Sequence, residues 1–337
     1  MTLRDVGHSV LFHARRAGRA AGGVAATEAD RIRFRRSRAD IALFHKFAPP
    51  PYGGGNQFLL ALKDELERRG LEVEVNRISG ATPACLVNSF NFDFRRLRRL
   101  DRPGCRIVHR VDGPIGVYRG FDDGTDDRIA AINGELADAT IVQSRFSLEA
   151  HRSLGIELRD PVVVHNAVDS RIFHPPQLRE PLSGRKVRLI ATSWSDNPNK
   201  GGETLAWLDR NLDRSRFELT LLGRFSAAFE HARVLAPLPS EAVANELRQH
   251  DLYIAASRND PCSNALLEAL ACGLPAAYLD SGGHPELVGE AGLPFADDEE
   301  LPAVLARLVD EIEQRRSAIQ VPALADVAEL YLEVLRG

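Results

Sequence analysis

Short apolar runs alternate with amphipathic segments along most of the chain. Such runs are typical of buried parallel strands, and apolar residues spaced three or four apart indicate helices packed on a sheet. Strands are predicted at 41–44, 71–75, 84–87, 106–109, 139–142, 162–164, 187–192, 217–222, 252–256 and 276–279. Helices are predicted at 58–66, 127–136, 146–154, 203–212, 241–249, 264–271, 301–315 and 323–335. This alternation predicts an α/β fold with parallel sheets covered by helices on both faces.

A polar stretch rich in proline, residues 175–184, interrupts the alternation and has the composition of a linker. The chain has 337 residues, which is long for one ordinary hydrophobic core. We therefore expect two Rossmann-like, doubly wound domains that face each other across a cleft. The expected boundaries are residues 40–178 and 186–316, with residues 317–337 as a C-terminal helix.

Residues 1–39 differ from the rest, because nine arginines there stand against three acidic residues. This basic N-terminal extension fits either a solvated segment or a surface that touches anionic lipid, which would make the protein a peripheral membrane enzyme. The net charge of −4 gives no case for a nucleic-acid partner, and no apolar run reaches the ~20 residues that span a bilayer. Four cysteines without a CxxC pair are typical of buried thiols in a reducing cytoplasm, so a cytoplasmic location is expected.

The segment from Asp260 to Pro275 is the most informative part of the chain. It follows a predicted buried strand with a polar turn and then a helix. Ligands of open α/β sheets bind beyond the carboxyl ends of the strands, where this turn would lie. The amides of the helix N-terminus suit a phosphate, and a carboxylate such as Glu268 can accept hydrogen bonds from a ribose diol. The segment thus predicts a nucleotide or nucleotide-sugar site.

Several common motifs are missing. The chain has no GxGxxG dinucleotide motif, no GxxxxGK[ST] phosphate loop and no GxSxG nucleophile turn. The acidic run at 122–127 fits neither an EF-hand nor an Asp-x-Asp pair, so we expect no metal site.

A further set of short motifs follows one another in a characteristic order. They are Gly53-Gly54-Gly55, His109, Gln143-Ser144, His165-Asn166-Ala167-Val168-Asp169, Lys200-Gly201, Asp260 to Glu268, and Gly282-Gly283-His284-Pro285-Glu286. With this order and spacing, the chain from about Ile41 to about Phe295 resembles retaining glycosyltransferases of the GT-B fold, in glycosyltransferase family 4 (glycosyl transferases group 1).

The resemblance implies an activity and a set of site residues. It implies a donor that is a nucleotide-diphosphate sugar, an acceptor side in the first domain, and a donor site in the second that uses neither a metal nor another cofactor. The implied catalytic residues are His109, Lys200 and Asp260. The implied donor-binding residues are Gly54, Gly55, Lys200, Arg224, Ser263, Asn264, Glu268, Gly282, Gly283 and Glu286.

The chain departs from the family pattern in two places. The family has an arginine shortly before Lys200, where this chain has Thr192 to Asp196, and Arg224 is the nearest replacement or a plain surface residue. Asp260 stands where the family has a glutamate. A nucleotide-sugar 2-epimerase and a non-catalytic nucleotide-sugar-binding module therefore stay as alternatives. The acceptor, whether glycan, glycolipid or small molecule, also stays open.

Overall fold

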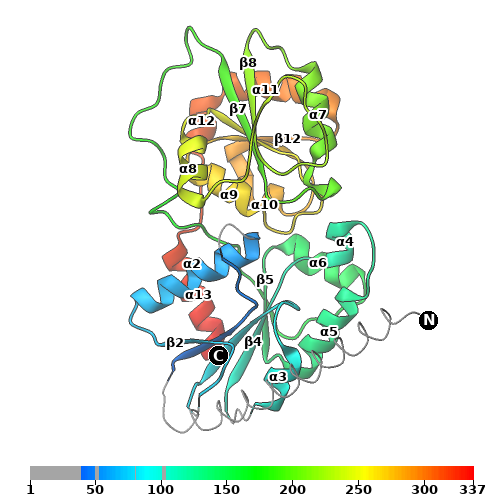
Figure 1. Ribbon diagram of the computed structural model, residues 1–337, viewed down its shortest axis with the longest axis vertical. Coiled ribbons are helices and arrows are strands. Elements are labelled where there is room, and N and C mark those ends of the chain that lie inside the picture. Colours follow the sequence, from blue (N-terminus) through cyan, green and yellow to red (C-terminus); the bar gives the residue numbers. More distant parts are fainter. Residues whose placement is uncertain (1–38, 50–52, 80, 101–103) are drawn as a thin grey trace, which may run out of the picture.

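The computed structural model describes residues 39–49, 53–79, 81–100 and 104–337, which form two α/β domains stacked end to end (Figure 1). All but the last residue of the basic N-terminal extension lies outside the described residues. Each domain contains one parallel six-stranded sheet with helices packed on it. The predicted architecture of two Rossmann-like domains is confirmed.

The first sheet has the strand order β2-β1-β3-β4-β5-β6, and all its pairings are parallel. Its strands are β1 (Ile41–Phe44), β2 (Val73–Val75), β3 (Ala84–Asn88), β4 (Arg106–Val111), β5 (Ala139–Val142) and β6 (Pro161–Val163). Its helices are α2 (Gly54–Arg68), α3 (Phe94–Arg99), α4 (Ile115–Arg119), α5 (Thr125–Leu136) and α6 (Arg145–Ser153). Because all strands of this sheet are parallel, the loops after β1 and β4 open at the same edge, next to the second domain.

The second sheet has the order β12-β11-β10-β7-β8-β9, again all parallel. Its strands are β7 (Val187–Ser193), β8 (Phe217–Gly223), β9 (Arg233–Leu235), β10 (Leu252–Ala255), β11 (Ala276–Leu279) and β12 (Gly292–Phe295). The helical segments are η1 (Pro198–Lys200), α7 (Gly202–Asn211), α8 (Ser240–Arg248), α9 (Asn264–Ala271), α10 (His284–Val288), η2 (Gly289–Ala291), η3 (Asp298–Glu300), α11 (Leu301–Asp310), α12 (Ile312–Ser317) and α13 (Leu324–Arg336). The strand order reverses between β7 and β10, which places the loops after these two strands side by side.

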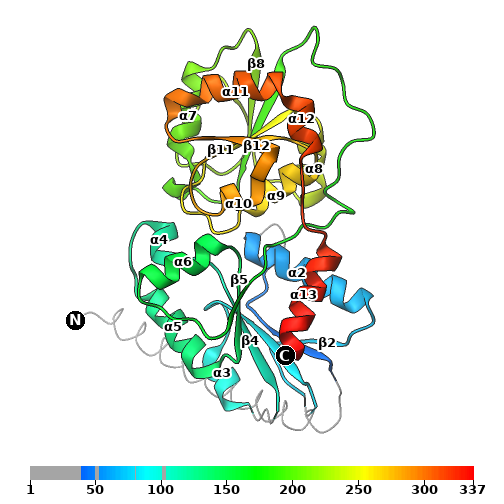
Figure 2. The ribbon, with the colours of Figure 1, turned by 180° about the vertical axis from the view of Figure 1, so that it is seen from behind.

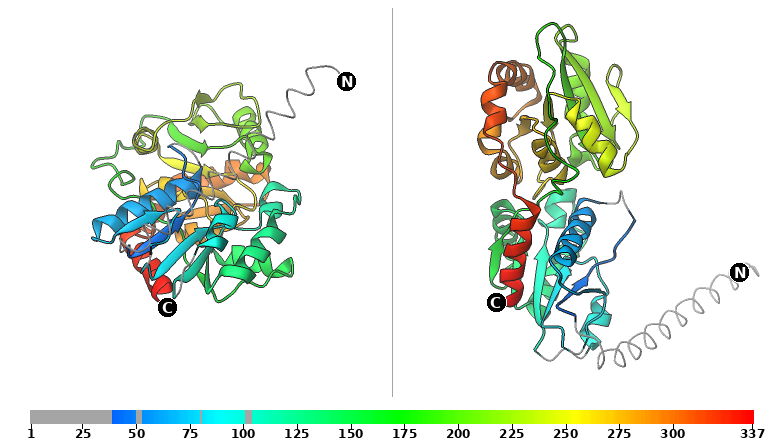
Figure 3. Two further views of the ribbon diagram at one scale, coloured as in Figure 1. Left: turned by 60° about the horizontal axis from the view of Figure 1, so that its bottom comes forward. Right: turned by 90° about the vertical axis from the view of Figure 1, so that its left-hand side faces the viewer.

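The last helix belongs structurally to the first domain. After α12 the chain crosses back, and α13 packs along α2 and against β3, β4 and β5 (Figures 2 and 3). Its apolar face, which includes Leu324, Val327 and Leu332, is buried in the first domain's core together with Phe58 and Leu62 of α2. The two domains are therefore joined by two chain crossings.

Most predicted elements are present, with two informative differences. Strand β4 runs to Val111 and not to residue 109, and the predicted helix 301–315 is broken into α11 and α12. The short strands β9 and β12 were not predicted. No helix among the described residues is both long and apolar enough to cross a membrane.

Candidate functional site

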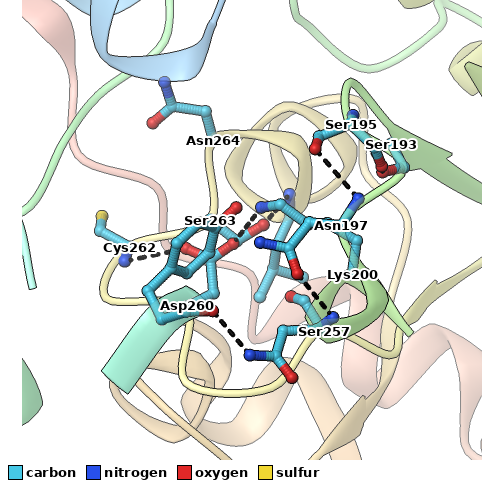
Figure 4. Close-up of polar contacts among 12 residues, drawn as sticks. Ser193, Ser195, Asn197, Lys200, Ser257, Asp260, Cys262, Ser263 and Asn264 are labelled. Carbon is cyan, nitrogen blue, oxygen red and sulfur yellow. Dashed lines mark hydrogen bonds and ion pairs between the residues drawn. The ribbon is translucent and has the colours of Figure 1, made fainter. Parts of the chain in front are cut away.

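The reversal point of the second sheet brings Lys200 and Asp260 into contact. Lys200 ends η1, in the loop after β7, and Asp260 lies in the loop after β10. The Lys200 Nζ and Asp260 Oδ2 atoms are 2.7 Å apart (Figure 4). Burial lowers the pKa of Lys200, but the Asp260 carboxylate and the Tyr118 hydroxyl together raise it by more, and Lys200 keeps the pKa of Asp260 low despite its burial. Both groups are therefore charged, and each neutralises the other.

Three small cavities run through this region between the two domains. The Asp112 cavity, of about 190 Å³, is lined by Asp112, Lys200 and Asp260. The central cavity, of about 100 Å³, shares Lys200 and Asn264 with it. The Glu268 cavity, of about 120 Å³, shares Trp194 and Asn264 with the central one. The three cavities thus form one path with a cation in its middle and a carboxylate at each end.

Glu268 closes one end of this path. It lies on α9, and no described residue donates a hydrogen bond to its carboxylate. Burial raises the pKa of the Glu268 carboxyl to about 8, because no nearby cation offsets the cost of removing the charge from water. A carboxylate without a protein partner in such a place is ready to accept hydrogen bonds from a ligand.

The N-terminus of α9 faces the middle of the path. The Ser263 hydroxyl accepts a hydrogen bond from the amide of Leu266, so Ser263 is the N-cap of this helix. Asn264 is engaged across the domain boundary: its Nδ2 donates to the Gly54 carbonyl at 2.7 Å, and its Oδ1 accepts from Asn166 Nδ2 at 2.8 Å. Asn264 therefore ties α9 to the glycine-rich turn of the first domain.

Gly54 and Gly55 begin α2 and line the same path. A Cβ atom at Gly54 would lie 3.1 Å from Asn264 Nδ2. A side chain there would push Asn264 out of its hydrogen bond, which accounts for glycine at this contact between the domains.

Asp112 closes the other end of the path. It directly follows β4, and its Oδ1 accepts hydrogen bonds from Arg110 Nη1, at 2.8 Å, and from Gln143 Nε2. Arg110 is fully buried and also donates to Asn88 and Asn166. The sequence places Arg110 and Asp112 just after His109, where they could orient it or touch the acceptor, but the hydrogen bonds of this network were not predicted. The signal for it was present, because Asp112 lies at a strand's carboxyl end, where ligand contacts of this fold class gather.

His109 does not lie in the cleft. Its ring is fully buried within the first domain, where Nε2 donates to the Ser89 carbonyl at 2.9 Å and Nδ1 accepts from Asn133 Nδ2. Burial lowers its pKa to about 4, so the ring is neutral. The prediction assumed that the strand ends at His109. Because β4 is two residues longer, Asp112 takes the place at the cleft, and we do not retain His109 as a donor contact.

The predicted contacts of Gly282, Gly283 and Glu286 with the donor are also revised. The two glycines pack against the backbone that carries Asp260: a Cβ atom would lie 2.4 Å from the Asp260 carbonyl oxygen at Gly282, where φ is +65°, and 2.3 Å from that of Pro261 at Gly283. They shape the Asp260 turn and do not line the three cavities.

Glu286 reaches into the other domain. Its carboxylate accepts hydrogen bonds from the amides of Arg145 and Phe146 at the start of α6, at 2.9 and 2.8 Å. His165 Nε2 lies 3.2 Å from the same carboxylate. Glu286 thus caps a helix of the first domain from the second.

Two aromatic residues that the sequence analysis did not assign to the site lie along the path. Trp194 lies in the stretch from Thr192 to Asp196, where the family pattern predicts an arginine, and it lines both the central and the Glu268 cavities. Arg224 packs its guanidinium over the Trp194 ring, 5.0 Å from the centroid, and does not itself line the three cavities. Tyr118 of α4 lies over Lys200, with 5.1 Å between Nζ and the ring centroid. Within the described part of the chain, no group of three or more His, Cys, Asp or Glu side chains is placed to hold a metal ion.

Comparison with known proteins agrees with this geometry. The family model for Glycosyl transferases group 1 matches residues 207–311. The chain resembles the GT-B glycosyltransferases. No curated protein matches the sequence significantly.

Solved structures of this class match nearly the whole chain. Sucrose-phosphate synthase from Thermosynechococcus elongatus superposes with a TM-score of 0.69 at 16% identity, over 89% of this chain and 98% of that one. The Anabaena protein HepE in complex with UDP and glucose gives 0.65 at 15% identity, over 88% and 99%. The catalytic domain of Arabidopsis thaliana starch synthase IV, bound to ADP and acarbose, gives 0.66 at 11% identity, over 89% and 99%. At these identities the structures establish the shared fold, and the family match supports a glycosyltransferase enzyme.

Proposed function

We propose that the protein transfers a sugar from a nucleotide-diphosphate donor to an acceptor hydroxyl, with retention of the anomeric configuration. The observation that carries this proposal is the order of groups along the path between the domains. A carboxylate without a partner, a lysine beside a helix N-terminus, and a pair of carboxylates follow one another. A nucleotide sugar presents ribose hydroxyls, a diphosphate and sugar hydroxyls in that same order.

Each part of the path has a chemical task in this proposal. Glu268 accepts hydrogen bonds from the ribose diol, and Trp194 gives an apolar wall beside it. Lys200 and the amides at the start of α9 hold the diphosphate, whose negative charge grows as the anomeric bond breaks. The leaving group is thus stabilised by protein charges alone.

The Lys200–Asp260 ion pair sets the electrostatics of donor binding. In the unliganded protein Asp260 balances the lysine charge at 2.7 Å. A bound diphosphate would share Lys200 with Asp260, whose carboxylate then becomes available to the hydroxyls of the sugar. We propose a front-face reaction in which a diphosphate oxygen deprotonates the acceptor.

Titration of donor binding tests the proposal. A thermal-shift panel of UDP-, ADP- and GDP-sugars selects the donor, because a ligand of the native state raises its melting temperature. Isothermal calorimetry then compares the wild type with Lys200→Ala and Glu268→Ala, each expected to weaken donor binding at least about tenfold, in line with one lost charged hydrogen bond. Lys186→Ala, an exposed lysine of the same domain outside the three cavities, is the control and should bind as wild type. Unchanged donor affinity in both site variants would contradict the assignment.

The product distinguishes the transferase from its two alternatives. A 2-epimerase converts the donor without an acceptor, which proton NMR of the protein with UDP-GlcNAc would detect. A non-catalytic module releases no nucleoside diphosphate above the background rate. The transferase predicts release that rises when an acceptor is added.

A further inference from the structure

Asp112 is held so that one of its carboxylate oxygens faces the cavity. Its Oδ1 is fixed from behind by Arg110 and Gln143. No described residue makes a hydrogen bond or an ion pair with Oδ2, and Asp112 is 25% exposed and lines the Asp112 cavity. The carboxylate therefore has a fixed orientation and a free acceptor.

The hydrogen bonds that hold this carboxylate in place extend into the core of the first domain. Arg110 is fully buried, and its other donors are taken by Asn88 Oδ1, Asn166 Oδ1 and the Tyr331 hydroxyl, at 2.7, 2.9 and 3.1 Å. An arginine bound on all sides cannot turn toward a ligand. Arg110 does not itself line the cavity, whereas Asp112, which it holds, does.

The charges on the cavity wall become unequal once a donor binds. The charged residues that line the Asp112 cavity are Asp112, Lys200 and Asp260, one from the first domain and two from the second. A diphosphate occupies Lys200, so two carboxylates from opposite sides then face the sugar. A carboxylate oxygen without a protein partner accepts hydrogen bonds and repels another carboxylate, even where Arg110 offsets part of the Asp112 charge from behind.

We propose that Asp112, together with Asp260, selects the transferred sugar: a sugar that offers hydroxyl or ammonium donors at this end is accepted, and a uronic acid is excluded. This inference deepens the proposed function and rests on it. It makes Asp112 the residue of the first domain that determines donor specificity.

The test uses two donors that differ only at C6, where UDP-glucose has a CH2OH group and UDP-glucuronate a carboxylate. If the donor panel selects guanine, the pair is GDP-mannose and GDP-mannuronate. Calorimetry measures the dissociation constants of both sugars and of the nucleoside diphosphate alone, for wild type, Asp112→Asn and Asp112→Glu. Asp127→Asn, which removes an exposed carboxylate of α5 in the same domain, is the matched control.

The wild type is expected to bind the neutral sugar at least tenfold more tightly than the uronate. Asp112→Asn should reduce that ratio severalfold and leave the affinity for the nucleoside diphosphate within about twofold. Asp112→Glu keeps the charge and should keep most of the discrimination, and the control should match the wild type. Equal binding of the two sugars by the wild type, or an unchanged ratio in Asp112→Asn, would overturn the inference while the proposed function stands. Failure of the nucleoside diphosphate itself to bind would overturn both.

Discussion

Glu268 is partly buried and has no charged partner among the described residues, and its ionisation should therefore control the pH dependence of donor binding. In the free protein its pKa is raised to about 8, so the carboxyl is largely protonated at neutral pH. A ribose diol donates hydrogen bonds to the ionised form and lowers the pKa in the complex. Donor binding then releases a proton, and affinity should rise with pH by up to about tenfold per unit until about pH 8, and level off above it.

Dissociation constants of the nucleotide sugar between about pH 6.5 and about pH 9 check this prediction. The nucleotide sugar is the right probe, since its diphosphate diester does not titrate in that range. Glu268→Gln keeps the shape of the side chain and cannot ionise, so its affinity should be lower and flat across the window. A wild-type curve as flat as that of Glu268→Gln would show that Glu268 does not contact the ligand.

The comparison of His109 with Asp112 shows which part of the site the sequence could predict. Lys200, Asp260 and Glu268 follow strands that were identified correctly, and all three line the path. The same rule misplaced the contact of the first domain, because the apolar pattern does not reveal that β4 continues through His109 and Arg110 to Val111. Histidine and arginine are polar, so the sequence pattern makes the strand appear to end at these two residues, although both are buried within β4.

Among the elements, α6 is unusual because its N-terminus is capped by a residue of the other domain. Glu286 accepts hydrogen bonds from two amides of the first turn and lies beside His165. Glu286→Ala removes this cap, which is worth about 1 kcal/mol in ordinary helices. We expect the variant to open the unliganded protein, seen as a larger radius of gyration in small-angle scattering, and to bind the donor more weakly.

Glu290→Ala is the control for this prediction. Glu290 lies on the adjacent turn, and among the described residues its side chain makes only a 3.5 Å contact with Arg315 of its own domain, so its loss should leave the radius of gyration unchanged. A Glu286→Ala protein that keeps its compact shape but changes its preference among donor sugars would instead support the sugar contact predicted from the sequence.

Elements buried on both faces were the easiest to predict. The central strands of both sheets carry uninterrupted apolar runs, whereas β9 has mostly exposed side chains and β12 contains a glycine and a proline within four residues. β9 pairs in parallel with β8, and β12 with β11, at the two edges of the second sheet. This pairing joins residues that are far apart in the sequence, so local periodicity does not reveal it. The contact by which Glu286 caps α6 cannot be predicted from a single sequence for the same reason.

At the scale of the whole molecule, α13 connects the end of the chain to the candidate site. Its apolar face predicted a helix, but the pattern did not say which domain it would cover. The structure places it on the first domain, where the Tyr331 hydroxyl accepts a hydrogen bond from Arg110 Nε at 3.1 Å. Arg110 in turn holds Asp112. The packing of α13 on the first domain therefore helps to hold Asp112 in place at the cleft.

Tyr331→Phe tests that connection. The substitution keeps the ring, which is packed beside Phe58. It removes only the hydroxyl that accepts a hydrogen bond from the fully buried Arg110. Leaving a buried donor unsatisfied costs about 1–3 kcal/mol. We expect a loss of about that size in the free energy of unfolding, measured with urea. We also expect weaker discrimination between the neutral sugar and the uronate, because Arg110 then holds Asp112 less firmly.

Leu330→Ala, at the neighbouring position on the same helix but 44% exposed, is the control. It should lose less than about 0.5 kcal/mol and keep the discrimination. Equal stability of Tyr331→Phe and wild type would show that Arg110 does not depend on α13, and the helix would then serve the core of the first domain alone.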